Sequence, residues 1–296
     1  MALGKGKYHL IALSVAIVWG TTFASTKFLL AGGLDPKDIL FYRFLIAYIG
    51  IWFFGSRKLF AESAKDELLL LVCGLCGGSL YFLAENTALT IAPTSNVALI
   101  VCTAPVIIAG LSRLVLKSER LTKNALLGSV IALTGVALVV FNGKFILKIS
   151  PLGDLLSFFA AFFWAVYTIV LKHLDNHYST FFITRKVFFY GLLTILLLFP
   201  FSPLTVDLNV LFKPIVIGNL LYLGLTASLA CFVLWNLSVK HLGALKTTYY
   251  VYTVPLITFA ASAVMLDERV TAGALLGALL IVSGVYLAER GLSFRS

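Results

Sequence analysis

Glu85 is the one acidic residue deep inside an apolar stretch of this sequence. A charged carboxylate in such surroundings is costly unless it faces a cavity, pairs with a cation or takes up a proton. Asn86 follows it, and Tyr81 lies one helical turn before it on the same face. We therefore expect Glu85 to bind a substrate ammonium group or to carry a coupling proton. The alternative is a carboxylate that only holds neighbouring helices together.

Arg43 is a cation within a second apolar stretch. It could bind a substrate carboxylate, pair with Glu85, or extend to lipid headgroups. Arg185 and Lys186 occupy another apolar stretch, nearer its end. For these two, extension of the side chain to the headgroups is the expected role, because long cationic side chains bury their stems and keep their charges in water.

Aromatic and polar side chains recur at helical spacing in several other stretches. A cavity lined by rings suits an amphipathic ligand, because apolar groups and cations both stack on them. Aromatic residues also gather at membrane interfaces, which would explain part of the set. Together with Glu85 and Arg43, the expected substrate-binding residues are Trp19, Thr22, Tyr81, Asn86, Asn96, Trp164, Tyr167, Trp235, Asn236, Tyr249 and Tyr252.

Motifs typical of enzymes and metal sites do not combine into a site. Cys73 and Cys76 form C-x-x-C, but in a glycine-rich apolar stretch where close packing is the simpler role. His173 and His177 are four residues apart, and only Asp175 joins them. The sequence has no glycine-rich phosphate loop, so ATP is not the direct energy source. We expect no catalytic residues, no cofactor and no metal.

Membrane-spanning helices must position these residues. Of the 296 residues, 60% are hydrophobic and 12% are charged, which is too few polar residues to cover a soluble fold. A spanning helix needs about 20 mostly apolar residues. Charged residues, prolines and glycines divide the chain into ten such segments. They lie near residues 8–30, 38–56, 67–89, 94–116, 122–142, 152–172, 179–201, 213–238, 244–266 and 271–289.

The positive charges indicate the orientation. Connections on the side of the N-terminus carry 14 Lys and Arg residues, and those on the other side carry 5. Cytoplasmic loops are enriched in these residues. We therefore expect a multi-pass protein of the cytoplasmic (inner) membrane of a bacterium, with both termini in the cytoplasm. The net charge of +10 then reflects this orientation, and a nucleic-acid partner is not expected.

The two halves of the chain resemble each other. Phe82, Asn86 and Pro105 recur as Phe232, Asn236 and Pro255, 150 residues later. Over residues 119–138, 10 of 20 positions are identical to those 149 residues later. Each half holds five segments, and because five is odd, the second half must enter the membrane from the opposite side. We expect two repeats, at residues 1–148 and 149–296, in an inverted arrangement around a central cavity, which is the architecture of secondary transporters.

These features resemble the drug/metabolite transporter superfamily, in its EamA-type branch of ten-helix proteins. The resemblance rests on Trp19-Gly20 with Lys27, on Pro105 and Pro255, and on the segments that begin at Glu119-Arg120 and Glu268-Arg269. It implies an all-helical membrane protein that exports or exchanges amino acids and other small metabolites.

Pro105 and Pro255 fall within their predicted helices, where proline removes a hydrogen bond and kinks the chain. We expect hinges there, although static kinks are also common in membrane proteins. The resulting function is secondary active transport of small metabolites, with export of amino acids or related amphipathic compounds, and protons are a candidate coupling ion. The alternatives are an obligate exchanger, an importer of a nucleoside or of S-adenosylmethionine, and, from another class, an intramembrane enzyme. The expected partners are a small-molecule substrate and membrane lipid.

Overall fold

The computed structural model describes residues 3–54, 58–92, 94–115, 122–141, 150–201, 203–204, 207–266 and 271–290. Within these ranges, the side chains of residues 3–5, 94–95, 261–266 and 290 are not described. The motif segments at Glu119-Arg120 and Glu268-Arg269 lie outside the described residues, as does the expected boundary between the repeats at 148/149.

The first half of the chain forms five helical segments. They are α1 (Leu3–Ala31), α2 (Pro36–Ile51), a continuous segment of α3 (Ala64–Gly74), η1 (Leu75–Leu80) and α4 (Tyr81–Ile91), a broken segment of α5 (Thr94–Val101) and α6 (Ala104–Val115), and α7 (Lys123–Phe141). Each overlaps one of the predicted spans.

The second half repeats this order. Its segments are α8 (Pro151–Leu174), α9 (Thr180–Leu196), α11 (Pro214–Leu221) with η2 (Tyr222–Ala230) and α12 (Cys231–Leu242), α13 (Ala244–Thr248) with η3 (Tyr249–Thr253) and α14 (Val254–Leu266), and α15 (Ala272–Arg290). A short helix, α10 (Leu208–Leu211), lies in the connection before α11.

Seven of the described helical segments are long and apolar enough to cross a membrane. Among the others, α2 and α9 have 16 and 17 residues, and they carry Arg43 and the pair Arg185-Lys186. The chain is therefore an all-helical, multi-pass membrane protein, as its composition predicts.

The two repeats run in opposite directions. α1 begins beside the end of α15, where His9 Nε2 lies 3.5 Å from Glu289 Oε1. We call this the proximal end of the bundle. α8 begins at the other, distal end, where the Ser150 hydroxyl donates to the Ile91 carbonyl over 3.0 Å at the end of α4. α1 and α8 are thus antiparallel counterparts, as an inverted repeat requires.

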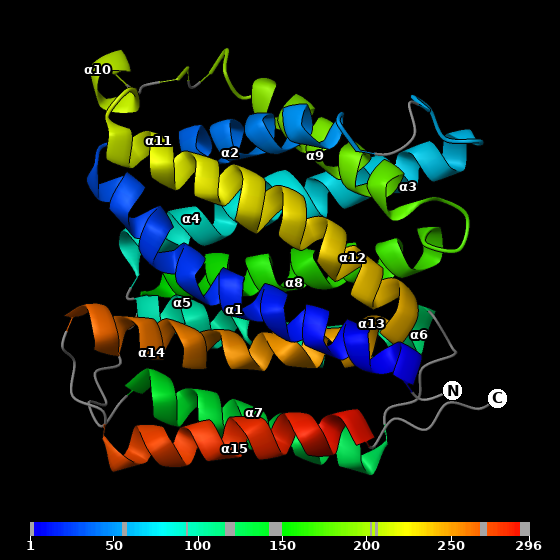
Figure 1. Ribbon diagram of the computed structural model, residues 1–296, viewed down its shortest axis with the longest axis vertical. Coiled ribbons are helices and arrows are strands. Elements are labelled where there is room, and N and C mark those ends of the chain that lie inside the picture. The colour runs from blue at the N-terminus through cyan, green and yellow to red at the C-terminus, as the bar shows by residue number, and fades with distance from the viewer. Residues whose placement is uncertain are drawn as a thin grey trace.

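The repeats interlock rather than lie side by side (Figure 1). α4 packs against α8 and α12 packs against α1, while α2 packs against η2 and α9 against η1. α7 and α15 pack against each other at one edge of the bundle, and α2 and α9 lie at the opposite edge (Figure 1). Each repeat therefore completes its packing with helices of the other repeat.

The repeated glycines explain the close contact of α7 with α15. A Cβ atom on Gly135 would lie 2.6 Å from the carbonyl oxygen of Gly277, and one on Gly284 would lie 2.6 Å from that of Gly128. Only glycine allows backbones to approach so closely, which is how small residues bring membrane helices together.

Irregular segments recur at equivalent places in the two repeats. η1 and η2 are π-helical and end at Leu80 and Ala230, 150 residues apart. The fourth segment of each repeat is interrupted just before its proline, so that Pro105 and Pro255 are the second residues of α6 and α14. Proline is favourable in the first turn of a helix, because the N–H it lacks has no partner there.

Candidate functional site

A central cavity lies between the two repeats. Its walls come from α1, α2, α4, α5, α6, α8, α12, η3 and α14 and from the break between α5 and α6. The lining residues are Trp19, Thr22, Phe23, Arg43, Tyr81, Phe82, Glu85, Ala98, Val101, Cys102, Ala104, Trp164, Phe232, Val251, Val254 and Pro255.

The aromatic wall of the cavity follows the symmetry of the repeats. The rings of Trp19 and Trp164, from the counterparts α1 and α8, meet edge to face with centroids 5.3 Å apart. Phe82 and Phe232, from α4 and α12, lie 6.3 Å apart beside them. Each repeat thus contributes one Trp and one Phe, and the cavity lies where the two repeats meet.

Glu85 breaks this symmetry with a charge. It is 9% exposed, and its carboxylate Oε1 accepts a hydrogen bond from the Tyr81 hydroxyl over 2.7 Å. Its position in the other repeat is occupied by Trp235. Glu85 therefore gives the apolar cavity one acidic wall, held in place by a neighbour on the same helix.

Arg43 provides the opposite charge. It is 3% exposed, its Nε donates to the Ser228 hydroxyl over 2.9 Å, and its guanidinium carbon lies 4.1 Å from the centre of the Phe82 ring. The opposite charges of Arg43 and Glu85 attract each other, but the two side chains form no direct ion pair. The two charges thus remain available to a ligand between them.

Six of the expected substrate-binding residues line the cavity. They are Trp19, Thr22, Arg43, Tyr81, Glu85 and Trp164, and the expected hinge residue Pro255 lines it too. Those that lie away from the centre of the membrane, such as Thr22 and Glu85, belong to the distal halves of α1 and of the α3–α4 segment. The cavity therefore extends from the centre of the bundle into its distal half.

Five other expected residues do not line the cavity but fill the proximal half beneath it. They are Tyr167, Trp235, Asn236, Tyr249 and Tyr252, each at most 1% exposed. Tyr167 donates to Asn236 Oδ1 over 2.6 Å, and Asn236 Nδ2 donates to the Thr184 hydroxyl over 2.9 Å. The Trp235 ring lies tilted against that of Trp19, with the two ring centroids 4.8 Å apart. These five residues form a buried proximal plug, in the half of the bundle opposite to the one into which the cavity extends.

The remaining expected residues lie outside the cavity lining. Asn86 is 1% exposed beside Glu85. Asn96 Nδ2 donates to Asp154 Oδ1 over 3.3 Å at the distal end. Pro105 is buried at the start of α6, one residue after Ala104 in the lining.

The lining also includes residues that the sequence did not single out. Phe82 and Phe232 recur 150 residues apart, so the repeat itself carried the signal that places them at the centre. Small and aliphatic residues such as Ala98, Val101 and Val254 carry no such signal, because their types are common in every membrane helix.

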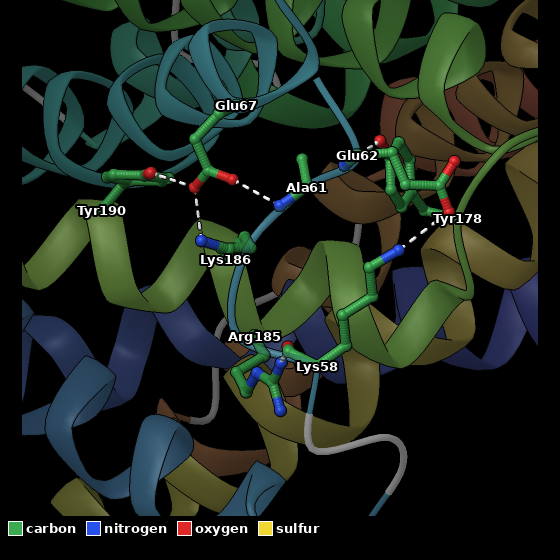
Figure 2. A network of polar contacts seen from close by, with 8 residues as sticks. All are labelled: Lys58, Ala61, Glu62, Glu67, Tyr178, Arg185, Lys186 and Tyr190. Carbon is green, nitrogen blue, oxygen red and sulfur yellow. Dashed lines mark hydrogen bonds and ion pairs between the residues drawn. The ribbon is translucent and has the colours of Figure 1, made fainter. Parts of the chain in front are cut away.

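A network of polar contacts closes the proximal end (Figure 2). Glu67 on α3 accepts hydrogen bonds from Lys186 and Tyr190 on α9, and from the Ala61 N–H over 2.6 Å. Arg185 donates to the Lys58 carbonyl. The segment that precedes α3 is thereby tied across α9.

The expectation that Arg185 and Lys186 extend to lipid headgroups is wrong. They are 5% and 4% exposed, and each is bonded within the protein. The Lys186 ammonium also lies 5.1 Å from the centre of the Phe60 ring and 5.2 Å from that of Tyr190, within cation–π range. Their partners lie more than a hundred residues earlier in the chain, so the local sequence does not reveal them.

The described part of the chain contains no group of three or more His, Cys, Asp or Glu side chains that could hold a metal ion. The four cysteines are free and buried. The cavity itself offers two opposite charges and a set of packed aromatic rings.

Comparison with known proteins agrees with this geometry. The model of the EamA-like transporter family matches residues 6–141 and 151–290. An uncharacterised transporter of Archaeoglobus fulgidus is 30% identical over 290 residues, which cover 96% of this chain and 97% of the relative. A solved crystal structure shares the fold with a TM-score of 0.74, at 18% identity, and covers 96% of both chains.

Two further relatives have more specific descriptions. A probable amino-acid metabolite efflux pump of Escherichia coli is 27% identical over 299 residues, covering 98% of this chain and 97% of its own. A probable terminal-alkyne amino-acid exporter of Streptantibioticus cattleyicolor is 26% identical, covering 98% and 95%. On the family match to both halves, this chain belongs to the EamA-like transporter family and is a transporter rather than an enzyme.

Proposed function

We propose that this protein is a secondary active transporter that exports amino acids or closely related zwitterions across the cytoplasmic membrane. The observation that carries the proposal is the placement of Arg43 and Glu85 in one aromatic-walled cavity without a direct ion pair. A zwitterion supplies the missing partner of each: its carboxylate meets Arg43, and its ammonium meets Glu85.

The energetics favour such a ligand over a singly charged one. A buried charge is costly unless it is paired, so a ligand with both charges compensates both walls at once. The rings of Trp19 and Trp164 and the aliphatic residues of the lining offer contacts to an apolar side chain. The same substrate class is supported by the descriptions of the E. coli relative as a probable amino-acid metabolite efflux pump and of the S. cattleyicolor relative as a probable terminal-alkyne amino-acid exporter.

The inverted repeat supports a mechanism of alternating access. The cavity reaches the distal half, and the buried plug of Tyr167, Trp235 and their neighbours closes the proximal half. Exchanging the roles of the two repeats, residues 1–148 and 149–296, would open the proximal half and close the distal one. The breaks before Pro105 and Pro255 are suitable hinges.

The charges of the chain support a direction of transport and a coupling ion for this proposal. The excess of Lys and Arg on the side of the N-terminus supports a cytoplasmic location for both termini, and so for the proximal end, in a bacterial cell. With this orientation the cavity extends toward the outside, the side on which an exporter releases its cargo. Glu85 is the group that would take up a proton from outside as the ammonium leaves.

Thermal unfolding of the purified protein against the twenty common amino acids tests the substrate class. A ligand stabilises the state it binds by mass action, so we expect one or more amino acids to raise Tm. The same compounds should have little effect on an Arg43→Met variant. No stabilisation by any amino acid, or equal stabilisation of wild type and variant, would contradict the proposal.

A further inference from the structure

Ser228 is the hydrogen-bond partner of Arg43 and has no place in the lining of the cavity. It is fully buried in η2, the π-helical segment of the second repeat. Its hydroxyl accepts from Arg43 Nε over 2.9 Å, and Arg43 makes no other hydrogen bond within the described residues. Ser228 therefore contacts the back of the guanidinium, on the side away from the terminal amino groups.

The terminal amino groups of Arg43 face the cavity. They donate to no acceptor among the described residues. Neither is a fully buried polar atom without a partner, so both keep some exposure. Arg43 itself lines the cavity. With Nε bonded to Ser228 and one face of the guanidinium against Phe82, the two amino groups form an open fork. Such a fork matches the two oxygens of a carboxylate in parallel hydrogen bonds.

A glycine one turn earlier sets the distance between η2 and α2. A Cβ atom on Gly224 would lie 2.6 Å from Ile46 Cγ2 and 3.2 Å from the Arg43 carbonyl oxygen. The absence of a side chain lets η2 approach the backbone of α2 beside Arg43. A π-helix is rare and often occurs at functional positions, and here it brings both Gly224 and Ser228 against the same part of α2.

The first repeat contains a similar pair of contacts between neutral residues. Gly74, 150 residues before Gly224, packs directly against Tyr190 on α9, and the hydroxyl of Ser79 in η1 accepts from the Thr194 hydroxyl over 2.7 Å. In both repeats a serine of the π-helix thus bonds to the second helix of the other repeat. In the first repeat the partner is the neutral Thr194, whereas in the second it is the charged Arg43, which lines the cavity. Because a neutral partner is enough to join the helices in the first repeat, that role alone does not require Arg43.

We infer that Ser228 is a positioning residue, which holds the Arg43 guanidinium by Nε so that its terminal amino groups form the carboxylate-binding half of the site. This inference rests on the proposed function and deepens it, because it makes a free carboxylate a requirement for tight binding. An amide or ester of the same compound loses the fork, although it keeps the ammonium and the side chain.

Paired ligands and a matched variant test the inference. The probes are L-leucine and L-phenylalanine with their amides, L-leucinamide and L-phenylalaninamide. Dissociation constants come from thermal stabilisation, and KM and Vmax come from counterflow in proteoliposomes. The variants are Ser228→Ala, Ser228→Thr, which keeps the hydroxyl, and Ser79→Ala, which removes the equivalent hydrogen bond away from the cavity.

Ser228→Ala should weaken binding of the amino acids by about tenfold, or about 1.4 kcal/mol, and change binding of the amides by less than about twofold. KM should rise while Vmax is kept. Ser228→Thr should restore most of the affinity, and Ser79→Ala should leave every constant unchanged.

The contradicting results separate the two hypotheses. If the wild type binds neither amino acid, the proposed function fails and the inference falls with it. If the wild type binds the amino acids but Ser228→Ala binds them equally well, only the inference is wrong. It is also wrong if Ser228→Ala weakens amino acids and amides alike, or if Ser79→Ala has the same effect, because the role is then general packing.

Discussion

Replacing Glu85 by glutamine removes the acidic charge of the cavity and keeps the shape of the side chain. The amide oxygen can still accept the hydrogen bond that Tyr81 donates to Glu85 over 2.7 Å, so the local structure should persist. What is lost is the interaction of the carboxylate with a substrate ammonium. Two unit charges about 4 Å apart attract by about 4 kcal/mol at an effective dielectric constant of about 20, and desolvation cancels part of this.

The net loss should lie near the value of a charge-assisted hydrogen bond, about 1.5–3 kcal/mol. At about 1.4 kcal/mol per factor of ten, Glu85→Gln should weaken amino-acid binding about 10- to 150-fold. If Glu85 also carries the coupling proton, the rate of transport should no longer depend on an imposed pH gradient. Titration of the purified protein and uptake into proteoliposomes measure the two effects.

Tyr81→Phe is the matched control, because it removes the hydroxyl that bonds Glu85 and leaves the charge. A neutral donor contributes about 0.5–1.5 kcal/mol, so this variant should lose at most about tenfold in affinity and keep its response to pH. Unchanged affinity and an unchanged pH response in a folded Glu85→Gln protein would refute the assignment, and Glu85 would then only hold helices together.

Three further substitutions test other parts of the structure. Gly135→Val should lower Tm or prevent folding, because a side chain there meets the α15 backbone and overpacking costs about 1–3 kcal/mol or more. Gly110→Val is the control and should be tolerated, because Gly110 has open space around it. Lys186→Met should destabilise the protein by about 1–3 kcal/mol, because it leaves Glu67 without its cation, and thermal unfolding should show partial recovery when Glu67→Gln is added. Trp164→Ala should weaken amino-acid binding by up to about tenfold, since an aromatic contact contributes about 0.5–1.5 kcal/mol; an unchanged dissociation constant would remove this ring from the site.

The helical segments and the inverted repeat could be predicted from the sequence because the membrane imposes simple rules. Apolar length defines each segment, and the recurrence of Phe82, Pro105 and their neighbours 150 residues later reveals the repeat. Once two repeats of five segments are recognised, the inverted arrangement and a cavity where they meet follow. The charged residues Arg43 and Glu85 stand out because ionisable residues are rare at such depth.

The same symmetry hides which half of the bundle is open. Thr22 and Tyr167 belong to counterpart helices and are equivalent candidates by sequence, yet only Thr22 lines the cavity and Tyr167 is buried in the proximal plug. The two repeats have similar sequences, so the pattern of residues does not indicate which half of the bundle holds the cavity. The role of Ser228 was also hidden, because it depends on a π-helical segment that the apolar pattern does not distinguish from an α-helix.

Counterflow of labelled L-leucine and L-phenylalanine in proteoliposomes of the purified protein tests the central claim most directly. Vesicles preloaded with the unlabelled amino acid should accumulate the labelled one transiently, and only when the protein is present. A variant that carries both Arg43→Met and Glu85→Gln should show none of this exchange, although it unfolds at a similar temperature. Exchange that persists undiminished in the double variant, or no protein-dependent exchange in the wild type, would contradict transport of zwitterions through this cavity.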